Sequence, residues 1–129
     1  MAVVALRIPP SASHVRTARL VAVAVARRLG LDEDRLDEIR LAVGEVCARS
    51  VRRCLASSVT LPISVVMDDA PGELQITVTD HASRSSGGPD EAVALALVGG
   101  LADAVEVEEG PSGPAGVVRM TWRVAQSER

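Results

Sequence analysis

Residues 39–55 read IRLAVGEVCARSVRRCL, and this stretch decides the interpretation of the whole chain. Its apolar residues recur at intervals of three and four positions, which is the spacing of one face of an α-helix. The acidic residues 32–34 before it suit the positive end of a helix dipole. We therefore predict a long helix from about Asp34 to Leu55, with a core face of Leu36, Ile39, Val43, Val46 or Cys47, Ser50 or Val51, and Cys54.

The segments on either side predict one strand and one helix before this helix, and a strand-rich half after it. Alternating and β-branched runs indicate strands, and Pro, Gly and Asp mark their ends. Ser11 or Ser13 can cap the first helix, which ends at Leu29 before Gly30, and Asp90 can cap the third. The predicted elements are strand 3–8, helices ending at 29 and spanning 34–55, strands 59–67 and 73–79, helix 91–101, and strands 104–109 and 117–124.

This order predicts an α/β protein of the α+β two-layer sandwich type. We expect a mixed, mainly antiparallel sheet of about five strands, covered on one face by three helices. The 129 residues are expected to form a single domain, 1–129. The core must be built from Ala, Val and Leu, since the chain has no Phe or Tyr and only one Trp. Trp122 is expected in that core or, at an exposed edge, as a partner contact.

Composition excludes several classes of function. The net charge of −3 and the near absence of aromatic rings argue against binding to nucleic acid. All 14 basic residues are Arg, which excludes a lysine-dependent phosphate loop. Cys47 and Cys54 lie two helical turns apart, about 10 Å, which is too far for a disulfide. Free thiols, the lack of an adequate apolar span and the lack of a signal peptide predict a cytoplasmic protein without a membrane segment.

Three strings, taken with their order and spacing, identify a family resemblance. They are residues 39–47 (IRLAVGEVC), 76–80 (ITVTD) and 95–103 (LALVGGLAD), and the closing strand 116–124 also fits. Together they resemble the serine-kinase-type anti-sigma factors of bacterial partner-switching systems. This resemblance places the chain in the ATPase superfamily shared by gyrase, MutL, heat-shock chaperones and histidine kinases.

The resemblance implies a nucleotide site of three elements, and this sequence departs from each. A helix should carry a Glu and, four residues later, a magnesium-binding Asn; Glu45 is present, but Arg49 stands at the Asn position and cannot ligate a metal. An Asp that accepts from the adenine amino group corresponds to Asp80, but the glycines after it are replaced by Ala82 and Arg84. The phosphate-cradling glycines are replaced by 92–94, Ala-Val-Ala. We therefore expect no catalytic residue, with Glu45 as a vestige, and no metal site.

Several roles stay open for these residues. Glu45 and Arg49 could form an ordinary exposed ion pair, or Arg49 could contact a phosphate. Asp80 could contact adenine or simply cap the loop after its strand. The helix has a basic end that consists of Arg49, Arg52 and Arg53. This end is either solvated surface or a docking face for a partner. Acidic residues 106, 108 and 109 allow the same two interpretations.

These observations predict a regulatory protein-binding module, anti-sigma-factor-like, with a degraded ATP site. Its expected partner is a sigma factor or an anti-sigma antagonist, and a homodimer or a heterodimer with a kinase homologue is a further option. No cofactor is expected, and ATP or ADP would bind weakly. The alternative is an active or weakly active ATP-dependent serine protein kinase that acts on an anti-sigma antagonist, so the sequence leans against an enzyme without deciding the question.

Overall fold

The structure is a computed structural model that describes residues 3–82, 89–109 and 116–124 of the chain. The elements follow the predicted order of strand, two helices, two strands, helix and two strands. Their bounds are β1 (Val3–Ile8), the short 3-10 helix η1 (Ala12–His14), α1 (Val15–Arg28), α2 (Glu33–Ala56), β2 (Ile63–Ala70), β3 (Glu73–Asp80), α3 (Pro89–Gly99), β4 (Ala104–Glu109) and β5 (Gly116–Arg123).

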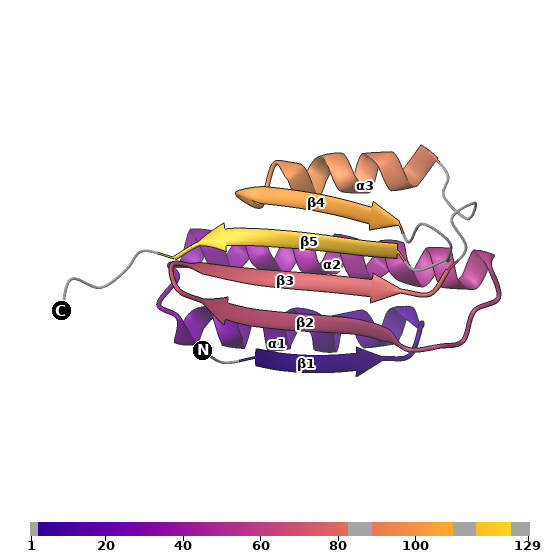
Figure 1. The fold of residues 1–129 in the computed structure, drawn as a ribbon, viewed down its shortest axis with the longest axis horizontal. Helices are drawn as coiled ribbons and strands as arrows, with labels where there is room; N and C mark the ends of the chain where they lie inside the picture. Colours follow the sequence, from indigo (N-terminus) through magenta and orange to yellow (C-terminus); the bar gives the residue numbers. More distant parts are fainter. Residues whose placement is uncertain (1–2, 83–88, 110–115, 125–129) are drawn as a thin grey trace.

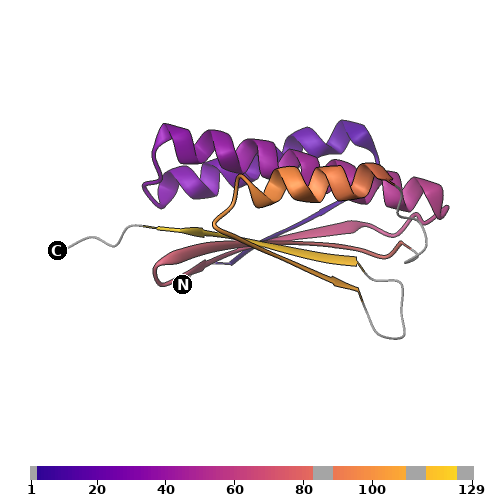
Figure 2. The ribbon, with the colours of Figure 1, turned by 90° about the horizontal axis from the view of Figure 1, so that it is seen from above.

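The five strands form one sheet in the order β1-β2-β3-β5-β4 (Figure 1). All four neighbouring pairs of described strands are antiparallel, so the sheet is more regular than the mixed sheet that the sequence suggested. The three helices lie together on one face of this sheet, as Figure 2 shows from above. The predicted α+β two-layer sandwich is confirmed.

Helix α2 is the central element of the helical layer, in contact with α1, α3, β2 and β3. Gly30 ends the preceding helix with a left-handed φ of 85°, and the Asp32 side chain then caps α2 by accepting from the Arg35 amide at 3.0 Å. The predicted core face of α2 is completely buried. At the two places where the sequence allowed either of two neighbouring residues, both residues are buried. Residues 36, 39, 43, 46, 47, 50, 51 and 54 make up this face.

The sheet contributes alternate residues to the same core. Inward positions of β2, β3 and β5 are almost completely buried, while their neighbours on the other face are partly exposed. Trp122 on β5 is fully buried, and its indole N–H donates to the Leu101 carbonyl at 3.1 Å. The expectation of a core role for this tryptophan is therefore confirmed, and the alternative of an exposed edge contact is wrong.

Three local predictions need correction. Strand β2 begins at Ile63 instead of residue 59, because Pro62 lacks the N–H that a ladder position requires. Neither Ser11 nor Ser13 caps α1; their hydroxyls lie 3.1 Å apart and bond to each other. Helix α3 begins at Pro89, so residue 90 lies inside it, and the side chain of Asp90 is outside the described residues.

Both cysteines are free and buried, as expected. Burial raises the pKa of the Cys47 thiol to about 12. Among the helices of residues 3–82 and 89–109, none has both the length and the hydropathy that a bilayer span requires.

Candidate functional site

A buried ion pair joins α2 to the end of β3. Asp80 is the last residue of β3, and Arg53 lies in the last turn of α2, which runs behind this end of the sheet (Figure 1). The Arg53 Nε lies 3.1 Å from Oδ2 of Asp80 and 3.5 Å from Oδ1. The side chains of Arg53 and Asp80 are only 2% and 1% exposed. Two opposite charges are thus held together away from solvent.

The chain supplies a second donor to Asp80 and a close-fitting wall beside it. The Ala82 amide donates to Oδ1 at 3.0 Å, so both carboxylate oxygens already accept from the protein. Gly116, the cross-strand partner of Asp80, packs directly against the pair. A Cβ at position 116 would lie 2.9 Å from Nη2 of Arg53 and 3.1 Å from Oδ1 of Asp80. A larger residue at 116 would therefore have to displace the guanidinium or the carboxylate.

The thiol of Cys54 belongs to the same neighbourhood. Burial raises its pKa, and the negative charge of Asp80 raises it further, while a backbone contact to His81 and the charge of Arg53 act in the opposite direction. Both Cys54 and Cys47 therefore favour the protonated thiol, which is neither a strong nucleophile nor a metal ligand. Within the described ranges, no three or more His, Cys, Asp or Glu side chains gather where a metal ion could bind.

The structure separates the three arginines of the predicted basic end, for which solvated surface and a docking face were both left open. Arg49 is 3% exposed and Arg53 is 2% exposed, whereas Arg52 is at the surface. Arg49 and Arg53 are buried because their side of α2 faces the sheet and α3. The interpretation of Glu45 and Arg49 as an exposed ion pair is accordingly wrong, and only Arg52 of the three is accessible to a partner in this structure.

Glu45 is half-buried and lines a hollow of about 340 Å³ between α1 and α2. Asp80 lies beside Arg53, which is in the last turn of α2. On the third element, Ala92 and Ala94 lie inside α3, with Ala92 exposed and Ala94 buried. Arg84 falls outside the described residues. Of the predicted site residues, Asp80 is paired with Arg53, and Glu45 lines the hollow between α1 and α2.

Sequence reasoning missed the Arg53–Asp80 pair, although a signal was present. Arg53 lies four residues after Arg49 and therefore shares its helix face. It also falls between Val51 and Cys54, two residues of the buried stripe. An arginine on a buried face needs an opposite charge, and Asp80 at a strand end was the acidic residue already singled out. The pairing itself depends on the crossing of α2 over β3, which the local sequence does not specify.

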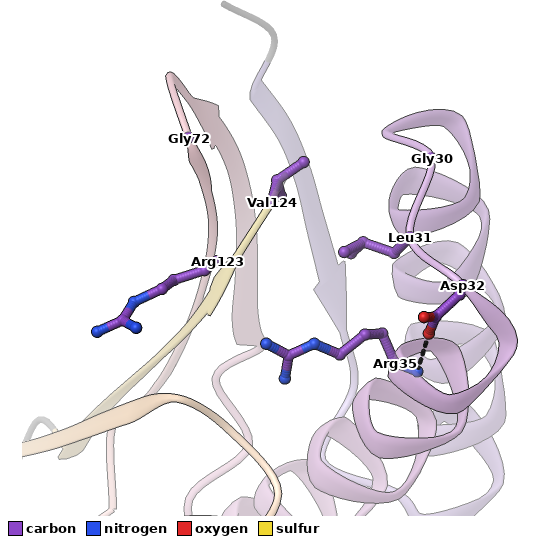
Figure 3. Close-up of a pocket in the computed structure, with 7 residues that line it drawn as sticks. All are labelled: Gly30, Leu31, Asp32, Arg35, Gly72, Arg123 and Val124. Carbon is purple, nitrogen blue, oxygen red and sulfur yellow. Dashed lines mark hydrogen bonds between the residues drawn. The ribbon is translucent and has the colours of Figure 1, made fainter. Parts of the chain in front are cut away.

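A separate cavity of about 580 Å³ lies at the opposite end of the sheet (Figure 3). At this cavity the Arg35 side chain extends from α2 toward the sheet, whereas the Arg123 side chain points away from Arg35. Arg35 donates to Asp103 at 2.8 Å and to Glu38 at 3.0 Å, and its pKa is raised by these bonds. The cavity is lined by Gly30, Leu31, Asp32, Arg35, Gly72, Arg123 and Val124.

Asp103 explains the arrangement around this cavity. Its Oδ2 also accepts from the Arg123 amide at 2.7 Å, and this bond, followed by that of Arg35, lowers the pKa of its carboxyl. A single carboxylate therefore ties α2 to β5 beside the cavity. We interpret the cluster as a structural tie, because its charges already satisfy one another.

Comparisons with known proteins bear on this fold. The solved structures that are similar to the chain include the following two. One contains the RsbU and RsbW domains of Rv1364c from Mycobacterium tuberculosis, with a TM-score of 0.78 and 18% identity, and the match covers 100% of this chain and 34% of that one. The other is the SiaB–SiaC complex from Pseudomonas aeruginosa, with a TM-score of 0.65 and 9% identity, covering 94% of this chain and 89% of that one. At these identities the likeness shows the fold alone, and the chain spans about a third of the length of the first.

The sequence families give a firmer assignment. No curated protein matches the chain. The family described as "Histidine kinase-like ATPase domain" matches residues 8–122. This range runs from the last residue of β1 to the last residue but one of β5 and includes Glu45, Arg53 and Asp80. Because this match covers most of the chain, the protein belongs to the histidine kinase-like ATPase domain family.

Proposed function

We propose that this chain is a regulatory protein-binding module of a bacterial partner-switching system, of the anti-sigma-factor type, that does not transfer phosphate. The observation that carries the proposal is the buried ion pair between Arg53 and Asp80. In the family that the sequence resembles, the residue at the Asp80 position accepts from the adenine amino group. Here the two oxygens of Asp80 accept from Arg53 and from the Ala82 amide.

The pair opposes nucleotide binding through its energetics. An adenine that used Asp80 would have to displace the Arg53 guanidinium, which is 2% exposed, from its carboxylate. Breaking a buried ion pair costs about 3–5 kcal/mol when no equivalent charge replaces it. An adenine amino group is neutral and does not replace that charge. This cost is equivalent to a loss of roughly two to four orders of magnitude in affinity.

The triphosphate end of the family site supports the same proposal. Arg49 replaces the metal-binding asparagine, and a guanidinium has no lone pair for magnesium. Ala92 and Ala94 stand within α3 where the family has phosphate-cradling glycines. The residues present therefore do not fit ATP with magnesium, and we derive no phosphoryl-transfer step from them.

Similar proteins support the partner-switching role. One similar structure contains RsbU and RsbW domains, and the other is a complex of SiaB with SiaC. By analogy, we propose a sigma factor or an anti-sigma antagonist as the partner. The two free buried thiols fit a reducing compartment, and we propose the cytoplasm.

Calorimetric titration with ATP and magnesium tests the proposal. The native chain is expected to show no binding at about 0.1 mM nucleotide, a concentration at which a micromolar site would be saturated. A second titration uses Arg53→Ala combined with Arg49→Asn, Ala92→Gly and Ala94→Gly, which frees Asp80 and restores the family residues. Micromolar binding by the native chain, or transfer of labelled phosphate to a candidate antagonist, would contradict the proposal. Either result would favour the alternative of a serine protein kinase, which the presence of Glu45 and Asp80 supports.

A pull-down tests the partner class separately. Sigma factors and anti-sigma antagonists of the source organism are each mixed with the purified chain. We expect one of the two classes to be retained. Retention of neither class would count against the anti-sigma assignment, whatever the nucleotide titration shows.

A further inference from the structure

A positively charged groove runs along the solvent side of the α1–α2 pair. Its first part is a hollow of about 410 Å³ lined by Arg16, Arg19, Leu20, Val23, Ala24, Arg27 and Arg40. Six of these residues belong to α1, at positions 16, 19, 20, 23, 24 and 27. Positions three or four apart lie on the same face of a helix, so these six form one stripe along α1. The hollow beside Glu45 shares Arg19 and Arg40 with it, so the two parts are continuous.

The charge of this groove is one-sided. Four arginines and no carboxylate line its first part, and Glu45 is the one acidic residue lining the second. Arg27 pairs with Glu33, and Arg40 pairs with Asp37. Within the described part of the chain, neither Arg16 nor Arg19 lies within 4.0 Å of a carboxylate. Two exposed positive charges thus flank the groove without a partner on this surface.

The groove also exposes apolar surface. Leu20 on α1 is 61% exposed and Leu41 on α2 is 57% exposed, while Val23 between them is buried and forms part of the floor. Gly44 lets the stem of Arg19 cross α2 at close range, since a Cβ there would lie 2.9 Å from Cδ of Arg19. The groove therefore presents leucines and an aliphatic floor between arginines. A partner with an apolar stripe bordered by acidic residues would be complementary to it.

We propose that this groove binds an acidic amphipathic helix of a partner protein. The stripe from Arg16 to Arg27 extends about 16 Å along α1, which corresponds to roughly three turns of a docked helix. Leucine or similar side chains of the partner pack against Leu20 and Leu41, and carboxylates on its flanks pair with Arg16 and Arg19. The inference rests on the proposed protein-binding function and names the chemistry of the partner.

Other occupants fit the groove less well. A second copy in a two-fold dimer would bring the same arginines against one another, and like charges at an interface are unfavourable. An extended membrane surface cannot enter a concave groove to reach Val23. Nucleic acid would satisfy the arginines but not the exposed leucines, and the groove offers no aromatic ring for base stacking.

The test uses a fluorescent synthetic peptide of about 15 residues, long enough for four helical turns, with leucines along one face and glutamates on both sides of it. A matched peptide has glutamine in place of every glutamate. Binding to the full chain is followed by anisotropy at about 0.05 M and about 0.5 M salt. The variants are Arg19→Glu and Gly44→Ala. Arg28→Glu is the control, because Arg28 is an exposed arginine of α1 that does not line the groove.

The expected results separate the groove from general electrostatics. The glutamate peptide should bind at least tenfold more tightly than the glutamine peptide, and high salt should weaken this binding. Arg19→Glu should weaken it at least tenfold, and Arg28→Glu less than twofold. Gly44→Ala should weaken it without lowering stability, because alanine favours the helix while its Cβ displaces Arg19.

Any of three results would overturn the proposal: equal binding of the two peptides, equal effects of Arg19→Glu and Arg28→Glu, or no binding of the glutamate peptide at about 1 mM. It would also be overturned by tighter, Arg19-dependent binding of an anionic vesicle or an oligonucleotide. None of these results bears on the nucleotide titration, which reports on Arg53 and Asp80. Failure of the groove and failure of the proposed function are therefore distinguishable.

Discussion

Replacing Arg53 with methionine is expected to destabilise the protein strongly. Methionine retains much of the apolar stem but removes the charge, so the buried Asp80 carboxyl loses its charged partner and keeps the hydrogen bond from the Ala82 amide. Removing one member of a buried ion pair costs about 3–5 kcal/mol. A domain of this size has a free energy of unfolding of about 5–15 kcal/mol, so a large part of it would be lost.

Urea unfolding followed by tryptophan fluorescence measures this loss directly. Trp122 is the only aromatic residue and is completely buried, so its emission reports on the packing of the sheet without interference. Arg52→Met is the matched control: it makes the same substitution at the neighbouring position, where the arginine is exposed. We expect the control to change the free energy of unfolding by about 0.5 kcal/mol or less.

A double-mutant cycle separates the ion pair from the loss of packing. Asp80→Asn keeps an oxygen that can accept from the Ala82 amide but removes the negative charge. The cost of the double variant Arg53→Met/Asp80→Asn should be smaller than the sum of the two single costs by about 2–3 kcal/mol. If the two costs add, or if Arg53→Met is no worse than Arg52→Met, the pair does not hold α2 on β3 and our reasoning is wrong.

Three further predictions concern other features of the fold. Gly116→Ala should cost about 1–3 kcal/mol in urea unfolding, because its Cβ would lie 2.9 Å from Arg53, whereas Gly99→Ala, with no atom within 4 Å, should cost nothing. The free energy of unfolding should fall as pH rises above about 9, since Cys47 ionises at its ordinary pKa only in the unfolded chain and at about 12 in the folded one. With no Lys or Tyr to titrate there, Cys47→Ala should visibly flatten this decline. Asp103→Asn should lower stability at neutral pH but not at low pH, because the folded carboxyl has a lowered pKa and loses its contribution as the native chain is titrated with acid; an equal loss at both pH values would contradict the assignment.

Much of the fold could be predicted because local signals agree with one another. The α2 stripe follows the helix period without interruption, and strands 73–80 and 116–123 alternate strictly between buried and partly exposed positions. The errors arise where one residue changes the local rule. Pro62 delays β2, and two serines that could cap a helix bond to each other.

The candidate site was less predictable, because its chemistry depends on contacts between distant segments. Asp80 was identified from its motif, but its partner lies 27 residues earlier on another element. Arg49 and Arg53 belong to a cluster of arginines that resembles solvated surface in one dimension. Only the packing of α2 between the sheet and its neighbouring helices shows which members are buried.

The two features proposed to matter most lie on opposite faces of one helix. Gly44 in the groove and Arg53 in the ion pair are nine residues apart, which at about 100° per residue places them about 180° apart around α2. Their neighbours agree, since Leu41 is exposed whereas Val46 and Ser50 are buried. Substitutions on one face should therefore not change the contacts on the other, and their effects on stability should add. An Arg53→Met/Arg19→Glu double variant whose cost departs from the sum by more than about 0.5 kcal/mol would show instead that α2 transmits a change from the groove to the ion pair.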